Sequence, residues 1–142
     1  MNETIRKFGW SATLVREFEH WLVLARAAQP TLGSLVLAAK SEATAFGDLP
    51  AAAHAELKQV TMAIEAGLAR AVDYQRLNYL MLMMVDPHVH FHVIPRYQAA
   101  REWQGREFVD AGWPKVPDLS HAVALEGEEL AGLVSWLREG FA

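Results

Sequence analysis

Residues 88–94 place histidine and apolar side chains in strict alternation, and this pattern constrains the fold more than any other feature of the chain. The segment reads His-Val-His-Phe-His-Val-Ile. Because successive side chains of a β-strand point to opposite faces of a sheet, the three imidazoles share one face and the apolar side chains share the other. We therefore predict a strand over residues 88–94, whose extension is limited by Pro95.

Two other segments have the periodicity of amphipathic helices. Four aliphatic residues of the longer segment recur at spacings of three or four: Leu57, Val60, Ile64 and Leu68. They predict a helix over residues 50–72, with Asp48 as its N-terminal cap and one face packed on a sheet. A C-terminal helix is predicted over residues 126–139, with Gly140 as its stop.

Strands are predicted on both sides of the long helix. Residues 13–15 and 21–24 are predicted to pair as a hairpin, and residues 34–38 follow as a third strand. Residues 77–85 are nearly all apolar, which predicts a central strand buried on both faces. Residues 97–120 contain prolines and glycines and are predicted to be irregular. This order of elements predicts an α+β domain with an antiparallel sheet.

Length, charge and cysteine content exclude several classes of function. A chain of 142 residues is expected to form one domain. Its net charge of −4 gives no electrostatic reason to expect a nucleic acid or an anionic membrane as partner. Because there is no cysteine, disulfides, thiolate metal sites and cysteine nucleophiles are excluded. The sequence contains no membrane-spanning run and no signal peptide, so we expect a cytoplasmic protein.

The three histidines are hard to explain by packing, because each buried imidazole needs hydrogen-bond partners. A metal site is one alternative. Same-face neighbours are about 6.6 Å apart at Cα, but His88 and His92 are about 13 Å apart, which is too far for easy convergence on one ion. A site with two of these histidines would need a further ligand, such as His54, Asp86 or Glu102, and no spacing selects one of them.

Nucleophilic catalysis fits the pattern better. An imidazole can attack phosphorus and form a covalent phosphoramidate, which divides one difficult displacement into two easier ones. A carbonyl oxygen that accepts a hydrogen bond from Nδ1–H would leave the Nε2 lone pair free to attack. A second histidine on the same face could protonate the leaving group or hydrogen-bond to the phosphate oxygens.

The motif His88-Val89-His90-Phe91-His92-Val93-Ile94, followed by Pro95-Arg96, resembles the His-φ-His-φ-His-φ-φ signature of the histidine-triad family, where φ is apolar. Residues 33–40 resemble, more weakly, a family strand that begins Gly-His and ends Pro-Lys. The resemblance covers about residues 12–98 of a single domain, residues 1–142, in which residues 99–142 form an irregular segment and a C-terminal helix. It implies an α+β fold with a five-stranded antiparallel sheet, a long helix and a C-terminal helix, and a homodimer in which two sheets join.

The resemblance also implies roles for individual residues. His90 is the nucleophile that receives a nucleoside monophosphate, and the main-chain carbonyl of His88 orients it. His92 lies near the phosphate and the leaving group, and Asn78 reaches the phosphate from the neighbouring strand. The expected partner is a small nucleotide substrate, and no metal or other cofactor is required.

Three departures from the family pattern bear on the substrate. Ser34 stands where many members have a fourth histidine. Arg26 lies near the place of an acidic residue that holds ribose in some members, and an arginine there could bind phosphate instead. The loop 84–87 lacks the small polar residues that often contact the leaving phosphate. We include Ser34, Arg26 and Arg96 with Asn78 in the expected substrate-binding set.

These departures leave the nucleophile in place and the substrate open. The expected activity is cleavage of a phosphoanhydride or phosphoramidate bond at the α-phosphorus of a nucleotide. Dinucleoside polyphosphates, aminoacyl adenylates and nucleoside phosphoramidates all fit this chemistry. The alternatives are a nucleotide-binding or interaction module of the same fold with little catalysis, and a metal-dependent enzyme that uses the triad histidines as ligands.

Overall fold

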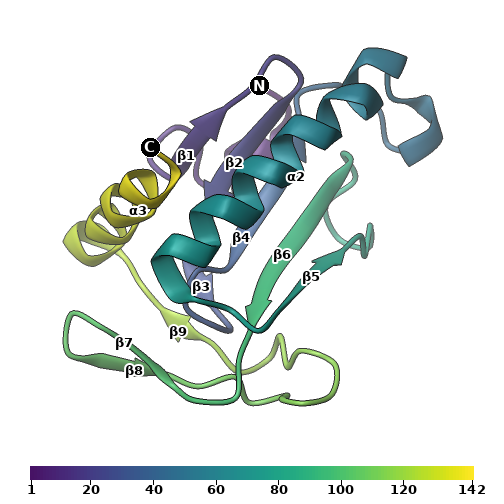
Figure 1. The fold of residues 1–142 in the computed structure, drawn as a ribbon. Helices are drawn as coiled ribbons and strands as arrows, with labels where there is room; N and C mark the ends of the chain where they lie inside the picture. Colours follow the sequence, from purple (N-terminus) through teal and green to yellow (C-terminus); the bar gives the residue numbers. More distant parts are fainter.

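A five-stranded antiparallel sheet with the strand order β1-β2-β4-β6-β5 forms the centre of the fold (Figure 1). The computed structural model describes residues 1–142. The strands of this sheet are β1 (Leu14–Glu17), β2 (Trp21–Ala25), β4 (Leu35–Ala39), β5 (Arg76–Leu80) and β6 (His90–Arg96). The predicted α+β class and the antiparallel sheet are therefore confirmed.

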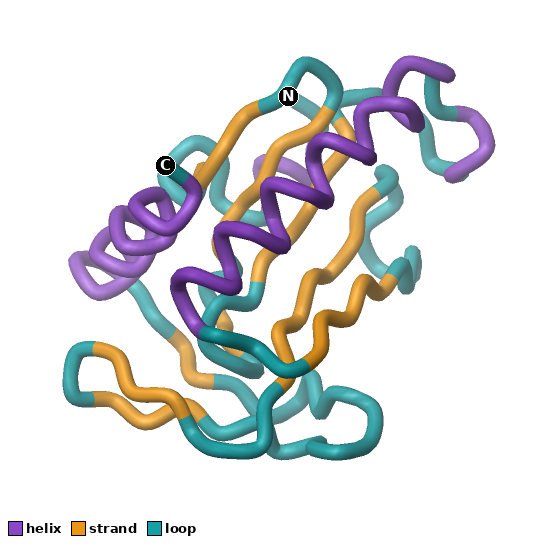
Figure 2. The backbone as a smooth tube through the Cα atoms, viewed as in Figure 1, coloured by secondary structure: helices purple, strands orange, loops and turns teal.

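Two long helices cover one face of the sheet, and Figure 2 shows them beside each other. The helical elements are α1 (Glu3–Lys7), the 3-10 helix η1 (Phe46–Asp48), α2 (Ala51–Val72) and α3 (Gly127–Phe141). None of the helices is both long and apolar enough to cross a lipid bilayer.

Each face of the sheet packs against its own hydrophobic cluster. The side chains of the larger cluster lie between the sheet and α2, where the indole of Trp21 donates a hydrogen bond to the carbonyl of Ala53 at 2.8 Å. The smaller cluster lies on the opposite face and contains Ile5, Leu22, Leu24, Val36 and Ala38. All residues of β2 and β4 are buried, because both faces of these strands are covered.

The prediction of a buried central strand over residues 77–85 is wrong. The strand β5 ends at Leu80 and lies at the edge of the sheet, and the chain then forms a loop in which Met84 is 85% and Val85 is 81% exposed. Apolar composition shows that a segment favours burial, but it does not show which strand has neighbours on both sides. Here β2, β4 and β6 take the interior positions.

Three boundary predictions also need correction. Asp48 lies in η1 rather than capping α2, whose N-cap is Pro50 without a side-chain hydrogen bond. The strand β6 continues past Pro95 to Arg96. Because β4 begins opposite Val93, no β4 residue lies opposite Pro95, and the N–H that proline lacks is not needed for pairing with β4. The helix α3 continues through Gly140 to Phe141.

The segment predicted to be irregular contains short strands. A hairpin is formed by β7 (Arg101–Trp103) and β8 (Arg106–Phe108). A second small ribbon joins β3 (Ala28–Gln29) to β9 (Val123–Ala124) and ties the segment before α3 to the sheet. Strands this short carry too little alternation to be detected in the sequence.

Candidate functional site

His90 and His92 lie on the same face of β6, as the alternation predicts. They stand opposite Ala38 and Val36 of β4, and directly opposed residues of antiparallel strands share a face. Their ring centroids are 5.1 Å apart, and the rings meet edge to face at 83°. The site therefore lies on the face of the sheet away from α2, beside the smaller hydrophobic cluster.

The main chain orients the imidazole of His90. Its Nδ1 lies 2.8 Å from the carbonyl oxygen of His88. Because a carbonyl oxygen only accepts hydrogen bonds, this contact requires the proton on Nδ1 and leaves the lone pair on Nε2. The residue is 2% exposed. His90 is thus held in the tautomer that a nucleophilic imidazole needs.

His88 precedes β6, so the predicted start of this strand is two residues too early. Its Nδ1 is 3.0 Å from the hydroxyl of Thr4, its Nε2 is 3.1 Å from a carboxylate oxygen of Glu42, and its N–H donates to the Thr4 hydroxyl at 3.2 Å. These contacts hold the peptide group whose carbonyl orients His90. Thr4 and Glu42 were not predicted as site residues, because nothing in the sequence links them to position 88.

His92 is kept uncharged by its surroundings. Burial first, then the positive charge of Arg26 and the charge that His90 has when it is protonated, lower the pKa of His92 from 6.5 to about 4, against the opposing charge of Asp86. Its Nδ1 is buried and has no hydrogen-bond partner. At neutral pH, His92 is therefore an uncharged imidazole that can donate one hydrogen bond to a bound phosphate. It has no second proton to give to a leaving group.

Phe8, at the end of α1, covers both imidazoles. Its ring centroid lies 5.7 Å from that of His90 and 5.9 Å from that of His92. The helix α1 is joined to the sheet through the amide of Asn2, which donates to the carbonyl of Ala39 at 3.0 Å. The N-terminal helix thus forms one wall of the site, which the sequence did not predict.

The pKa of His92 predicts a pH-dependent stability. Between about pH 4 and about pH 6.5, the unfolded chain binds more protons at this position than the folded chain does. The free energy of unfolding should therefore rise with pH across this window and fall as the pH is lowered. Urea unfolding at several pH values should show a flatter dependence for His92→Gln than for the parent chain, whereas His121→Gln, at an exposed position, should not change the slope. Equal slopes for His92→Gln and the parent chain would contradict the assignment.

Arg26 is the predicted substrate-binding residue that the structure places beside the histidines. It follows β2, and its positive charge acts on His92. Its Nη1 is buried without a hydrogen-bond partner, and burial lowers the pKa of its guanidinium. Arg26, Lys7 and Phe8 line a cavity of about 280 Å³.

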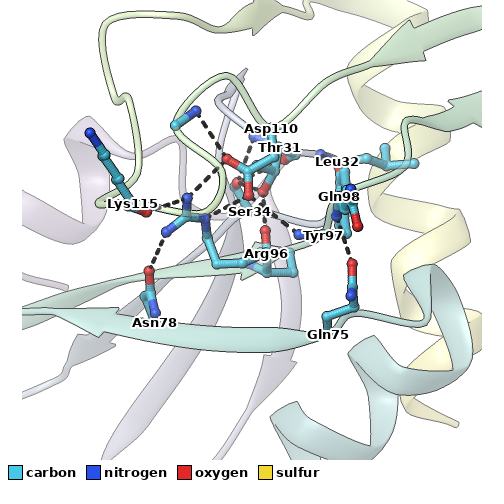
Figure 3. Close-up of polar contacts among 12 residues, drawn as sticks. Thr31, Leu32, Ser34, Gln75, Asn78, Arg96, Tyr97, Gln98, Asp110 and Lys115 are labelled. Carbon is cyan, nitrogen blue, oxygen red and sulfur yellow. Dashed lines mark hydrogen bonds and ion pairs between the residues drawn. The ribbon is translucent and has the colours of Figure 1, made fainter.

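The other three predicted substrate-binding residues lie at the far end of the strands (Figure 3). Asn78 is opposite Ile94, about 13 Å along β6 from His90, and Arg96 is about 20 Å from His90 by the same rise per residue. Ser34 is fully buried in the turn before β4, where its hydroxyl donates to the carbonyl of Thr31 at 2.7 Å. The structure does not bring these three side chains to the imidazoles.

Arg96 is the centre of a buried polar cluster. Its guanidinium donates to both carboxylate oxygens of Asp110 at 2.7 and 3.1 Å, to the amide oxygen of Asn78 at 2.8 Å and to the carbonyl of Lys115 at 2.8 Å. Figure 3 shows that these partners come from β5 and from the long segment after β8. The cluster ties that segment to the sheet. Arg96 and Asn78 also line the largest cavity, about 800 Å³, along β5.

No group of three or more histidine, aspartate or glutamate side chains is arranged to hold a metal ion. The two imidazoles that lie together could supply two ligands at most. The arrangement therefore offers a nucleophile, a neutral hydrogen-bonding imidazole and an unpaired cation on one face of the sheet.

The fold is similar to that of several solved structures, although no protein-family model and no curated protein matches the sequence. A histidine triad protein from Bradyrhizobium japonicum is 18% identical, with a TM-score of 0.69 over 100% of this chain and 97% of that chain. A hypothetical histidine triad nucleotide-binding protein from Sulfolobus tokodaii is 22% identical, with a TM-score of 0.68 over 97% and 89%.

A histidine triad protein from Sinorhizobium meliloti is 19% identical, with a TM-score of 0.68 over 99% of this chain and 95% of that chain. The likeness thus spans nearly the whole of each chain, including the sheet, the long helix and the C-terminal helix. The chain has the histidine-triad fold.

Proposed function

We propose that this chain is a nucleotide hydrolase or nucleotidyl transferase of the histidine-triad family, which cleaves a phosphoanhydride or phosphoramidate bond at the α-phosphorus. The observation that carries the proposal is the 2.8 Å contact between Nδ1 of His90 and the carbonyl oxygen of His88. It presents the Nε2 lone pair of a neutral imidazole on the face that also holds His92 and Arg26. The fold supports a nucleotide-directed function in general.

The proposed reaction has two steps. In the first, Nε2 of His90 attacks the α-phosphorus, a P–N bond forms, and the bond from phosphorus to the leaving oxygen or nitrogen breaks. In the second, water or an acceptor hydroxyl attacks the same phosphorus and gives its proton to the neutral ring of His92, the P–N bond breaks, and its electron pair returns to His90. No metal or other cofactor is required for this sequence.

His92 would contact the phosphate oxygens in both steps. Its uncharged ring donates one hydrogen bond, and the negative charge of a bound phosphate group raises its pKa. Substrate binding would then bring a proton to His92, from which the leaving group can take it. The protein would therefore take up the proton for the leaving group when the substrate binds.

The test is intact-protein mass spectrometry after brief incubation with adenosine 5′-phosphoramidate and, separately, with diadenosine tetraphosphate. We expect a transient added AMP on the parent chain, mapped to His90, and none on His90→Ala. The substrate that gives the adduct identifies the accepted leaving group. Absence of any adduct together with absence of AMP release would reject the enzymatic proposal for both substrates.

A nucleotide-binding module with little catalysis is the second candidate. It is favoured by the burial of His90, which is 2% exposed beneath the ring of Phe8. Because so little of His90 is exposed, its imidazole must become more accessible before Nε2 can reach phosphorus, whereas a ligand that binds beside the ring of Phe8 needs no such change. Calorimetric binding of a nucleotide without turnover above the buffer rate would favour this candidate.

The edge of the sheet supports the homodimer that the family resemblance implies. The outer edge of β5 has no neighbouring strand, and unpaired strand edges are templates for pairing. The exposed apolar residues near it are Leu82, Met84, Val85 and Val116. We propose a second copy of this chain as the partner of this edge.

A further inference from the structure

Arg26 is partly buried and carries a positive charge that no group of the protein neutralises. It takes part in none of the ion pairs, and its Nη1 has no hydrogen-bond partner. Buried donors of native proteins are nearly always paired, and a guanidinium has five N–H groups to satisfy. A buried donor without a partner lowers stability and is expected where it has a ligand to bind.

The cavity beside Arg26 is suited to an anion. It has a volume of about 280 Å³, and its lining includes no carboxylate: Lys7, Phe8, Gly9, Thr13, Arg26, Ala27, Ala28 and Leu130. The ammonium of Lys7 is 2.7 Å from a carboxylate oxygen of Asp86, so Arg26 is the cation whose charge is free for a ligand. A cavity of this size is large enough for a phosphate group.

This cavity adjoins the site of the proposed reaction. Phe8 lines the cavity and also contacts the rings of His90 and His92. The charge of Arg26 reaches His92, where it lowers the pKa of the imidazole. A substrate that places one phosphate at His90 can therefore extend past Phe8 and place another group against Arg26.

We propose that Arg26 forms a subsite for a second phosphate group of the substrate, separate from the phosphorus that His90 attacks. The inference rests on the proposed function and narrows its substrate class. A dinucleoside polyphosphate, or a nucleotide phosphorylated on its ribose, supplies the second phosphate. A nucleoside phosphoramidate has none, and an aminoacyl adenylate brings an ammonium group that the positive charge of Arg26 repels.

Calorimetry with Arg26→Gln tests the subsite. The ligands are AMP, ATP, adenosine 3′,5′-bisphosphate and inorganic tripolyphosphate. We expect the substitution to weaken binding of tripolyphosphate, and of either ATP or adenosine 3′,5′-bisphosphate, by about 10- to 100-fold, because each bond to a charged group contributes that much affinity. AMP should bind equally to both proteins. Arg6→Gln removes an equal charge from an exposed position of α1 outside the cavity and should change none of the affinities.

The ligand that loses affinity identifies the source of the second phosphate. Of the two nucleotides, a loss for ATP and not for adenosine 3′,5′-bisphosphate places it on the phosphate chain, and the reverse result places it on the ribose. Thermal unfolding should show that Arg26→Gln is at least as stable as the parent chain, because a charge without a partner is removed; marked destabilisation would indicate a structural role instead.

Equal affinities of Arg26→Gln and the parent chain for all four ligands would overturn the subsite, and so would an equal loss for AMP and ATP. The proposed function is judged separately by the His90 adduct. If tripolyphosphate binding depends on Arg26 while no nucleotide binds or reacts, the subsite is supported and the nucleotide function is rejected.

Discussion

Replacement of His90 by asparagine should lower kcat on the accepted nucleotide by roughly 10³- to 10⁶-fold, the range seen when a nucleophile is removed. In the proposed reaction, the imidazole supplies the electron pair that forms the covalent bond, and the hydrogen bond from Nδ1 to the carbonyl of His88 fixes which nitrogen supplies it. Asparagine keeps a polar side chain at this position but has no nitrogen lone pair that can attack phosphorus. Steady-state release of AMP measures the loss.

Two controls make this result specific. His121→Asn, at an exposed position outside the site, should leave kcat unchanged. Nucleotide binding should persist in His90→Asn, because the phosphate contacts of His92 and Arg26 remain. A His90→Asn protein with undiminished turnover would show that another group is the nucleophile and would end the proposed mechanism.

Asp110→Ala should lower the free energy of unfolding by about 3–5 kcal/mol, the cost of leaving one partner of a buried ion pair without the other. The side chains of Arg96 and Asp110 are 5% and 1% exposed, so water cannot replace the lost carboxylate. The carboxylate also accepts a hydrogen bond from the N–H of Tyr97 at 3.3 Å. The substitution should therefore release the segment after β8 from the sheet as well as destabilise the fold.

An exposed ion pair of the same chain provides the matched control. Arg106 and Glu129 are 42% and 46% exposed and lie 2.9 Å apart. Glu129→Ala should change the free energy of unfolding by less than about 1 kcal/mol, because solvent screens such pairs. Urea unfolding of the two variants measures the difference. Equal effects of the two substitutions would show that burial does not determine how much the Arg96–Asp110 pair contributes to the free energy of unfolding.

The sequence predicts this fold well where periodicity is long and regular. The helix α2 was predicted over residues 50–72 and spans Ala51–Val72, because an apolar stripe of several turns admits one interpretation. The alternation at residues 88–94 likewise places His90 and His92 on one face. The strand β5 was misplaced because burial depends on neighbours in the sheet, which composition does not describe.

The site is predicted less completely than the fold. His90 and its carbonyl partner follow from the motif, but Thr4 and Phe8 reach the site from the other end of the sequence; 84 positions separate Thr4 from His88. No local sequence pattern indicates a contact between residues so far apart in the chain. The family resemblance placed Asn78 and Arg96 at the phosphate, whereas the register of β5 and the rise of β6 place them toward the end of the sheet away from His90.

The role of position 88 in this fold differs from that of the two histidines that follow it. His88 gives His90 a peptide oxygen, while its ring is held by Thr4 and Glu42. Every amino acid supplies that oxygen. Glutamine could retain hydrogen bonds to a hydroxyl and still leave His90 oriented. Chains with this chemistry should therefore occur in genomes with only two histidines on the strand, and searches that demand three would pass over them.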